Sequence, residues 1–361
     1  MSRPRVLLTG AAGKVGRYVA PQLAAENFEV YGTDLLASSG DKAAMHYRQC
    51  DLTQRDRVEA LVAWARPDIV LHTAAIVAPI SYTCSALARQ VNLDASRYLL
   101  DCCDRQPRRP HFVFCSSYTV HGPCAPGVSP WHGDTAYAPV DDYGLQKVQA
   151  ERSVKVYAGN WTILRIGGVF DADVLIPSHR SFKAFAFMVP LAQREHGVDV
   201  QDVVAALVGA ARVAPRNKVL MIGGDASWQR TAEEIRGDLF AAMGLSAPRP
   251  EAYRQVSTEG HGGWYCENWM DTKEAQALLD FQNHSYADFL ARVKKKSRML
   301  RWFSPVLRPL IERSLYKGSP YLGADAISSG KSIWDDITRV YQVSDGDLEM
   351  PLSEESLGQA L

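Results

Sequence analysis

The start of the chain decides the fold through Val6-Leu7-Leu8-Thr9-Gly10-Ala11-Ala12-Gly13-Lys14-Val15-Gly16, a short apolar run that breaks into three glycines spaced three apart. Residues 17–23 follow with the apolar spacing of a helix. This pattern predicts a strand, a tight turn and a helix N-terminus. Gly10 allows the sharp turn, Gly13 allows the backbone to approach a pyrophosphate, and Gly16 allows the helix to pack against the strand. The unpaired N–H groups of that helix would then face the phosphates of a ligand.

A second strand supports a dinucleotide site. It is predicted at residues 28–33 and ends in Asp34, at the distance past the glycines where a ribose-binding carboxylate belongs. Asp34 would accept hydrogen bonds from the ribose hydroxyls and repel a 2′-phosphate; the alternative is a solvated strand end. The pattern therefore predicts NAD as the cofactor, in preference to NADP. The predicted cofactor contacts of this region are Gly10, Ala12, Gly13, Lys14, Val15, Gly16 and Asp34.

Composition narrows the class of protein. The 361 residues include 40 basic and 40 acidic side chains, so no overall field favours nucleic acid as a partner. The seven cysteines form no C-x-x-C pair and several lie in apolar runs, so we expect neither a disulfide framework nor a metal site. The chain enters a strand almost at once, which leaves no room for a signal peptide, and no apolar run reaches the roughly 18 residues needed to span a bilayer. These features predict a cytoplasmic protein.

Strands and helices alternate along the first half of the chain. Apolar or β-rich runs are separated by helical patterns, with the strands expected at 45–50, 69–75, 111–117 and 161–170 and the helices at 55–65, 86–103 and 141–157. Such alternation is typical of an α/β protein with a Rossmann-type, doubly wound parallel sheet. We expect an NAD-binding domain at 1–170, interleaved with a smaller, mixed α/β substrate-binding portion at 171–343. A loose acidic tail is expected at 344–361.

Small or polar residues follow these strands. Asp51 suits a contact with the adenine edge, and it suits the N-cap of the next helix equally well. Ala74 and Ala75 are small enough for the backbone to lie against the cofactor. Asn92, on an otherwise apolar helix face, is expected to bond to neighbouring backbone and hold a strand end in place. His72 is interpreted as a hydrogen-bonded core histidine rather than a ligand.

Tyr143 and Lys147 are four residues apart in a predicted helix, so their side chains share one face. A phenol has an unperturbed pKa of about 10, and an adjacent ammonium would lower it by favouring the phenolate. Such a tyrosine can exchange a proton with a substrate hydroxyl while hydride moves between the carbinol carbon and a nicotinamide. Ser117, at the end of a predicted strand, would hydrogen-bond the substrate oxygen. Ser117, Tyr143 and Lys147 are therefore the predicted catalytic residues.

With these residues in place, the chain resembles an extended short-chain dehydrogenase/reductase of the NAD-dependent epimerase/dehydratase family, over roughly Arg5 to Gly209. The resemblance is carried by Thr9 to Gly16, which match T-G-x-x-G-x-x-G, and by Asp34, Asp51-Leu52, His72 to Ala75, Asn92, Cys115 to Ser117, Tyr143/Lys147 and Arg165 to Val169. It implies that Asp51 and Leu52 contact the adenine, that Lys147 also holds the nicotinamide ribose, and that Gly167 lines the nicotinamide. It also implies a homodimer built through a helix pair.

Two departures from the family pattern bear on the reaction. Dehydratases of this family carry an Asp-Glu pair after the catalytic hydroxyl, whereas this chain has Tyr118-Thr119, so water elimination lacks its proton carriers. The segment between Gly168 and Asp199 is shorter than in sugar-nucleotide epimerases and is apolar and aromatic, which favours a small-molecule substrate that is not strongly anionic. The predicted substrate-binding residues are Ser117, Tyr118, Thr119, Tyr143 and Phe182.

We therefore predict an NAD-dependent oxidoreductase that interconverts a secondary alcohol and a ketone. An epimerase that transiently oxidises a sugar or sugar nucleotide is the alternative, and an NAD-binding scaffold without turnover is a third. The basic amphipathic stretch 292–317 holds nine cationic residues and one acid. It would lie on an anionic membrane, cover the substrate pocket or form a dimer face.

Overall fold

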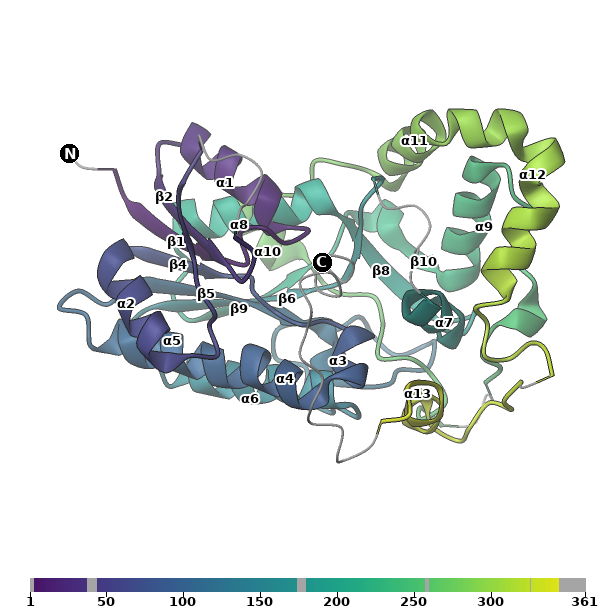
Figure 1. Cartoon of the computed structure of the whole chain (residues 1–361), viewed down its shortest axis with the longest axis horizontal. Helices are drawn as coiled ribbons and strands as arrows, with labels where there is room; N and C mark the ends of the chain where they lie inside the picture. The colour runs from purple at the N-terminus through teal and green to yellow at the C-terminus, as the bar shows by residue number, and fades with distance from the viewer. Residues whose placement is uncertain (1–2, 38–43, 174–179, 257–259, 325, 344–361) are drawn as a thin grey trace.

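A seven-stranded parallel sheet forms the centre of the computed structural model (Figure 1), which describes residues 3–37, 44–173, 180–256, 260–324 and 326–343. The tail predicted at 344–361 lies outside these ranges. The strands stand in the order β3-β2-β1-β4-β5-β6-β9. Their bounds are β1 Arg5–Thr9, β2 Glu29–Asp34, β3 His46–Gln49, β4 Ile69–His72, β5 His111–Ser117, β6 Trp161–Ile166 and β9 Lys218–Ile222. The strand order reverses between β1 and β4, the kind of position at which open α/β sheets bind ligands.

Helices cover both faces of this sheet. Val6 and Leu8 of β1 belong to one core and Leu7 to the other, because successive side chains of a strand point to opposite faces. The first core is closed by α1 (Gly16–Ala25), α8 (Val200–Val213) and α10 (Lys273–Leu279), the second by α2 (Arg55–Ala65), α5 (Ala95–Asp104) and α6 (Asp142–Lys155). Burial on both faces explains why the strands read as nearly continuous apolar runs. The predicted doubly wound α/β fold is confirmed.

The helix predicted at 86–103 is interrupted. It consists of α4 (Ser85–Arg89), a π-helical turn at Gln90–Asp94 and α5, and the short helix α3 (Ile80–Thr83) precedes it. Asn92 lies in the π-helical turn and is buried. Its amide accepts a hydrogen bond from the Ile76 N–H at 2.8 Å and donates one to the Ile76 carbonyl at 2.9 Å. Asn92 therefore holds the backbone that leaves β4, as predicted.

The C-terminal part is built around a small mixed sheet. In it β8 (Arg194–Asp199) pairs parallel to β7 (Gly168–Phe170) and antiparallel to β10 (Gln229–Thr231). A third core, with Trp228 at its centre, joins this sheet to α9 (Ala232–Met243), α11 (Tyr286–Lys296) and α12 (Arg298–Tyr316). Figure 1 shows these three helices at the opposite end of the molecule from α1 and β2.

Two further helices, α7 (Arg180–Met188) and α13 (Ile333–Tyr341), pack against each other, and α13 also contacts α3. A completely buried ion pair between Arg254 and Asp336 ties α13 to the loop that precedes it in sequence by some eighty residues. Among the helices that the structure describes, none is long and apolar enough to cross a membrane.

Candidate active site

The glycine turn after β1 has the predicted geometry. Gly10 has a φ of +70°, and a Cβ there would lie 2.8 Å from the Ala74 nitrogen. A Cβ on Gly16 would lie 2.0 Å from the Gly10 carbonyl oxygen, so only glycine lets α1 begin this close to β1. A Cβ on Gly13 would meet only that same carbonyl oxygen, at 3.2 Å, so the outer side of the turn is open. The turn therefore leaves room for a ligand phosphate beside the start of α1.

Asp34 closes the same end of the sheet. Its carboxylate accepts hydrogen bonds from the Ala12 N–H at 3.0 Å and the Leu36 N–H at 3.3 Å, which joins the end of β2 to the glycine turn. Burial raises the pKa of Asp34, and its backbone hydrogen bonds act in the opposite direction. An open glycine turn with a carboxylate at the neighbouring strand end fits the adenosine half of NAD.

The other predicted adenine-side residues already have partners. Asp51 accepts hydrogen bonds from the Thr53 N–H at 2.9 Å and the Gln54 side chain at 3.1 Å, in the turn before α2. Leu52 is buried in the second core. The Lys14 ammonium lies 5.3 Å from the centre of the Phe182 ring, so Lys14 joins the glycine turn to α7. Val15 caps α1.

The segment after β4 lies against β1. The Thr73 hydroxyl donates to the Thr9 carbonyl at 2.7 Å, and the Ala74 N–H donates to the Thr9 hydroxyl at 3.3 Å. His72 is buried and hydrogen-bonded to Thr9 and Ser96, and burial followed by the charge of Lys147 lowers its pKa to about 3. His72 is thus a neutral core residue, as predicted, and Ala74 and Ala75 follow it at the strand end.

Ser117, Tyr143 and Lys147 meet where β5 ends and α6 begins. Ser117, the last residue of β5, lies near enough to the Tyr143 phenol to lower its pKa. The Lys147 ammonium donates to the Cys115 carbonyl at 2.9 Å and lies 5.8 Å from the centre of the Tyr143 ring. All three side chains are buried. The predicted catalytic residues therefore form one cluster at the carboxyl end of the sheet.

Burial dominates the electrostatics of this cluster. It raises the pKa of Tyr143, the charge of Asp141 raises it further, and the hydrogen bond with Ser117 lowers it. Burial lowers the pKa of Lys147 to about 8. The expectation that a neighbouring ammonium makes the phenol acidic is therefore wrong for the protein by itself. Lys147 directs its charge to the Cys115 carbonyl, and desolvation of a phenolate outweighs it.

The predicted substrate-binding residues divide into two groups. Thr119 donates a hydrogen bond from its hydroxyl to Ser117 Oγ at 3.0 Å, so it lies in the catalytic cluster. Tyr118 is turned away, since its buried hydroxyl donates to Glu267. Phe182 contacts Lys14 at the glycine turn.

Gly167, predicted to line the nicotinamide, directly follows β6. Its N–H donates to the Ile222 carbonyl at the end of β9, at 2.9 Å.

Two aromatic residues of α7 pack into the protein core. Phe187 packs against Tyr253 and Tyr316, and Phe185 packs against Tyr82 and Tyr265. They were expected to give the substrate pocket an apolar lining. Because they stabilise the junction with the C-terminal part instead, they provide no argument about the charge of the substrate.

Two residues at the cluster were missed from the sequence. Asp141 is the N-cap of α6: it accepts from the Gly144 N–H at 2.6 Å and from the Tyr82 hydroxyl at 2.7 Å. An aspartate directly before a helical pattern is a cap signal that could have identified it. Gln146 accepts from the Asn92 amide at 2.8 Å and so links α6 to the π-helical turn. No local sequence pattern predicts the role of Gln146, because its partner, Asn92, lies in a different helical segment.

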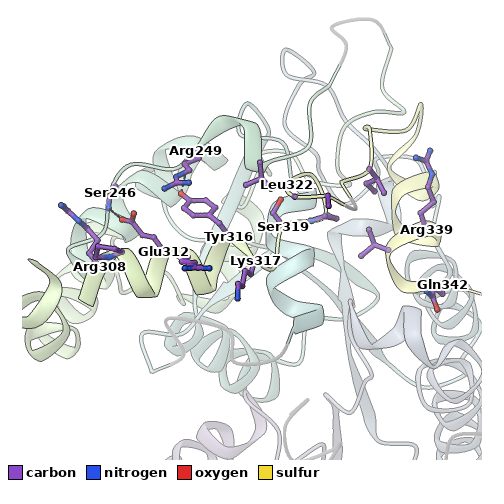
Figure 2. Close-up of a pocket in the computed structure, with 17 residues that line it drawn as sticks. Ser246, Arg249, Arg308, Glu312, Tyr316, Lys317, Ser319, Leu322, Arg339 and Gln342 are labelled. Atoms are coloured by element: carbon purple, nitrogen blue, oxygen red, sulfur yellow. Dashed lines mark hydrogen bonds between the residues drawn. The ribbon is translucent and has the colours of Figure 1, made fainter. Parts of the chain in front are cut away.

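A cavity of about 1070 Å³ lies in the C-terminal part, between α12, α13 and the loop that joins them (Figure 2). None of the predicted site residues lines it. Its walls carry cationic side chains from three segments, namely Arg249, Arg308, Arg313, Lys317 and Arg339. It is therefore a feature separate from the catalytic cluster.

Known proteins share both the sequence motifs and the fold. Residues 6–172 match the profile of the NAD dependent epimerase/dehydratase family. A probable dTDP-4,6-dihydroxy-2-methyloxan-3-one 4-ketoreductase of Streptomyces antibioticus is 29% identical over 307 residues, which cover 80% of this chain and 96% of that protein. A D-erythronate dehydrogenase of Cupriavidus necator is 38% identical over 89 residues, 25% of this chain and 27% of the relative.

Solved structures extend the likeness in fold to most of the chain. The UDP-glucose 4-epimerase of Thermotoga maritima, determined with UDP-glucose, superimposes with a TM-score of 0.66 at 21% identity and covers 81% of this chain and 98% of its own. A short-chain dehydrogenase/reductase superfamily protein of Agrobacterium tumefaciens with bound NAD gives a TM-score of 0.66 at 22% identity, over 83% and 98%. Residues 6–172 thus carry the profile of the NAD-dependent epimerase/dehydratase family, and the solved structures show that the likeness in fold continues through most of the chain.

Proposed function

We propose that this enzyme is an NAD-dependent oxidoreductase that interconverts a secondary alcohol and a ketone. The observation that carries the proposal is the buried cluster of Ser117, Tyr143 and Lys147 at the carboxyl end of β5. A hydroxyl donor, a proton-exchanging phenol and a cation within one desolvated site suit the oxygen of a carbonyl or an alcohol.

Each residue has a distinct task in this proposal. Bound NAD supplies the hydride acceptor, or the donor when it is reduced. Ser117 hydrogen-bonds the substrate oxygen and orients it toward Tyr143. Tyr143 gives its proton to a ketone oxygen during reduction and takes it back during oxidation. Lys147 supplies a positive charge that partly offsets the negative charge left on Tyr143.

The buried phenol suits the role of proton donor. Burial, followed by the charge of Asp141, raises the pKa of Tyr143, so a protonated phenol meets the ketone oxygen. We infer that the enzyme acts as a ketoreductase. The Streptomyces relative is named as a probable 4-ketoreductase, which agrees with this role.

Asp34 supports NAD rather than NADP as the cofactor. Its carboxylate lies beside the glycine turn, where it would accept hydrogen bonds from the adenosine ribose and repel a 2′-phosphate. The turn itself, open beside Gly13, would hold the pyrophosphate.

A nucleotide-linked keto sugar is the substrate class with the broadest support. It is anionic, unlike the substrate expected from the segment between Gly168 and Asp199. The Streptomyces relative, named for a dTDP-linked ketone, matches along 96% of its length, whereas the erythronate dehydrogenase matches along 27%. A sugar-derived hydroxy acid is therefore the second choice. The distinction is open to a direct assay with both substrates.

The test is a steady-state assay that follows the absorbance of NADH. We expect stoichiometric oxidation of NADH with a dTDP-4-keto-6-deoxysugar and loss of this activity in Tyr143→Phe. Oxidation of D-erythronate with NAD in its place would move the substrate class to hydroxy acids. Epimerised product without net NADH turnover, with NAD co-purifying, would contradict the oxidoreductase in favour of an epimerase.

We further propose a homodimer and a cytoplasmic location. Every one of the seven cysteines is a free thiol, which is typical of a reducing compartment. Light scattering on the purified chain would measure the mass of the particle, and a monomer across the working concentration range would contradict the dimer.

A further inference from the structure

The outer face of α12 carries large apolar side chains that the other described residues leave exposed. We call this set the outer stripe; it comprises Met299, Trp302, Phe303, Val306, Leu307 and Leu310. Trp302 is 81% exposed and Val306 is 78% exposed. The spacing of three and four residues places the stripe along one side of the helix. The rings of Trp302 and Phe303 stack on each other with their centres 6.0 Å apart.

The outer stripe makes the apolar surface of α12 wider than its packing requires. Beside the stripe on the same helix, Leu300, Ile311 and Leu315 pack into the C-terminal core. Those inner contacts already account for the attachment of the helix to the protein. A stable surface helix needs one buried apolar stripe, and a contiguous exposed apolar patch beyond it marks an interaction site.

Positive charge surrounds the stripe. Residues 292–317 hold nine of the 40 cations and one of the 40 acids of a chain with zero net charge. Arg292 pairs with Asp199 and Lys296 with Asp173, while the single acid, Glu312, accepts from the Ser246 N–H. Several of the remaining cations lack a carboxylate within 4.0 Å among the residues that the structure places, namely Lys294, Lys295, Arg298, Arg308, Arg313 and Lys317.

The basic cavity continues this positive region beyond α12. Figure 2 shows Arg308, Lys317 and Arg249 on one side of it and Arg339 of α13 on the other. Among the described residues that line it, Glu312 is the one acidic residue. The cations of α12 and those of the cavity beside it therefore both attract anionic groups.

We propose that α12 docks on the surface of an anionic lipid bilayer. The outer stripe enters the boundary between headgroups and acyl chains, and the cations of α11, α12 and the cavity contact headgroup phosphates. A helix with Trp, Phe and Leu on one face and Lys or Arg around it has the composition of interfacial membrane helices. Its aromatic pair suits the headgroup level, where Trp is enriched.

Two other occupants of the stripe fit the charges less well. A second copy joined stripe to stripe about a two-fold axis would bring two strongly cationic segments together. A partner protein is disfavoured by the lysines at 294–296, because lysine is depleted from protein interfaces. An anionic bilayer neutralises the cations and buries the stripe at once.

The experiment is flotation of the full-length protein with vesicles of phosphatidylcholine, with or without phosphatidylserine. We expect binding to the phosphatidylserine vesicles, weakened by salt because screening shortens the reach of the surface potential. Val306→Glu should lower the partition of the protein onto vesicles by about tenfold or more. It places a charge where the bilayer would bury an apolar side chain. The matched control is Val156→Glu at the end of α6, where the valine is 82% exposed, and it should bind like the unaltered protein.

A second variant tests the charges. Lys294→Glu with Lys295→Glu should reduce binding by at least about fivefold for each position. Substitutions are preferable to truncation at residue 292, which would also remove α13 from its contacts with α3 and α7. NADH oxidation should be unchanged in all these variants, which separates the docking surface from the active site.

Three results would overturn the proposal. They are equal binding by Val306→Glu and the unaltered protein, binding to pure phosphatidylcholine that ignores salt, and no vesicle binding combined with a dimer that Val306→Glu dissociates. The last of these would assign the stripe to a second copy of the chain.

Discussion

The two ends of the molecule differ in how far apart in sequence the residues that organise them lie. In the sheet half, the cofactor turn and the catalytic cluster are placed by strand ends, a glycine turn and a helix cap, each defined by neighbouring residues. In the C-terminal half, elements are joined by side chains far apart in sequence, such as Arg254 with Asp336 and Arg236 with Glu195. The candidate catalytic cluster therefore lies where local patterns are strong. The proposed membrane surface on α12 lies in the half that long-range contacts hold together.

The largest effect is expected from Tyr143→Phe in the sheet half. Removing the hydroxyl removes the proton donor while the ring keeps its packing, so kcat should fall by about 10²–10⁴ with little change in melting temperature. Tyr118→Phe is the control, since the Tyr118 hydroxyl bonds Glu267 instead. Equal losses of kcat in both variants would contradict the assignment of Tyr143.

The stability of the C-terminal half should depend strongly on its buried ion pair between Arg254 and Asp336. Asp336→Ala leaves the Arg254 guanidinium buried without its carboxylate, which costs about 3–5 kcal/mol of unfolding free energy. Urea unfolding measures this loss. The double variant Arg254→Met with Asp336→Leu should recover much of it, because both charges are then gone. No recovery would mean that other contacts of Arg254, such as its bond to the Gly263 carbonyl, carry the stability.

Cofactor choice tests whether the sheet half recognises NAD as its local pattern predicts. Asp34→Ser removes the carboxylate that opposes a 2′-phosphate, so the preference for NADH over NADPH in kcat/KM should fall by about 10- to 100-fold. The KM for NADH should also rise, because Asp34 holds the Ala12 N–H. An unchanged preference would remove Asp34 from the cofactor site.

The smallest expected effect is a shift in pH dependence. Asp141 raises the pKa of Tyr143, so Asp141→Asn, which keeps an oxygen for the Gly144 N–H, should lower it. Alcohol oxidation needs ionised Tyr143, and its activity should therefore rise at a lower pH than in the unaltered protein. A pH profile of kcat measures this. A shift to higher pH would contradict the sign of the Asp141 effect.

Much of the sheet half was predictable, and the reasons are visible in particular residues. Gly16 must be glycine because of an oxygen six residues before it, and the pair Tyr143 and Lys147 shares a face through helix geometry alone. The interruption at Asn92 was not predictable, since a π-helical turn leaves no periodic signal in five residues. Nor were the partners of Tyr118 and Gln146, which come from distant segments.

The sequence by itself determined the strand–turn–helix at residues 6–16, the carboxylate at Asp34 and the spacing of Tyr143 and Lys147. These features depend on residues within a few positions of one another. Only the tertiary structure decided that burial raises the pKa of Tyr143, that Phe187 of α7 packs inward, and that α12 leaves a wide apolar surface exposed among the described residues. Burial and electrostatic energy are sums over neighbours in space, and folding alone brings those neighbours together.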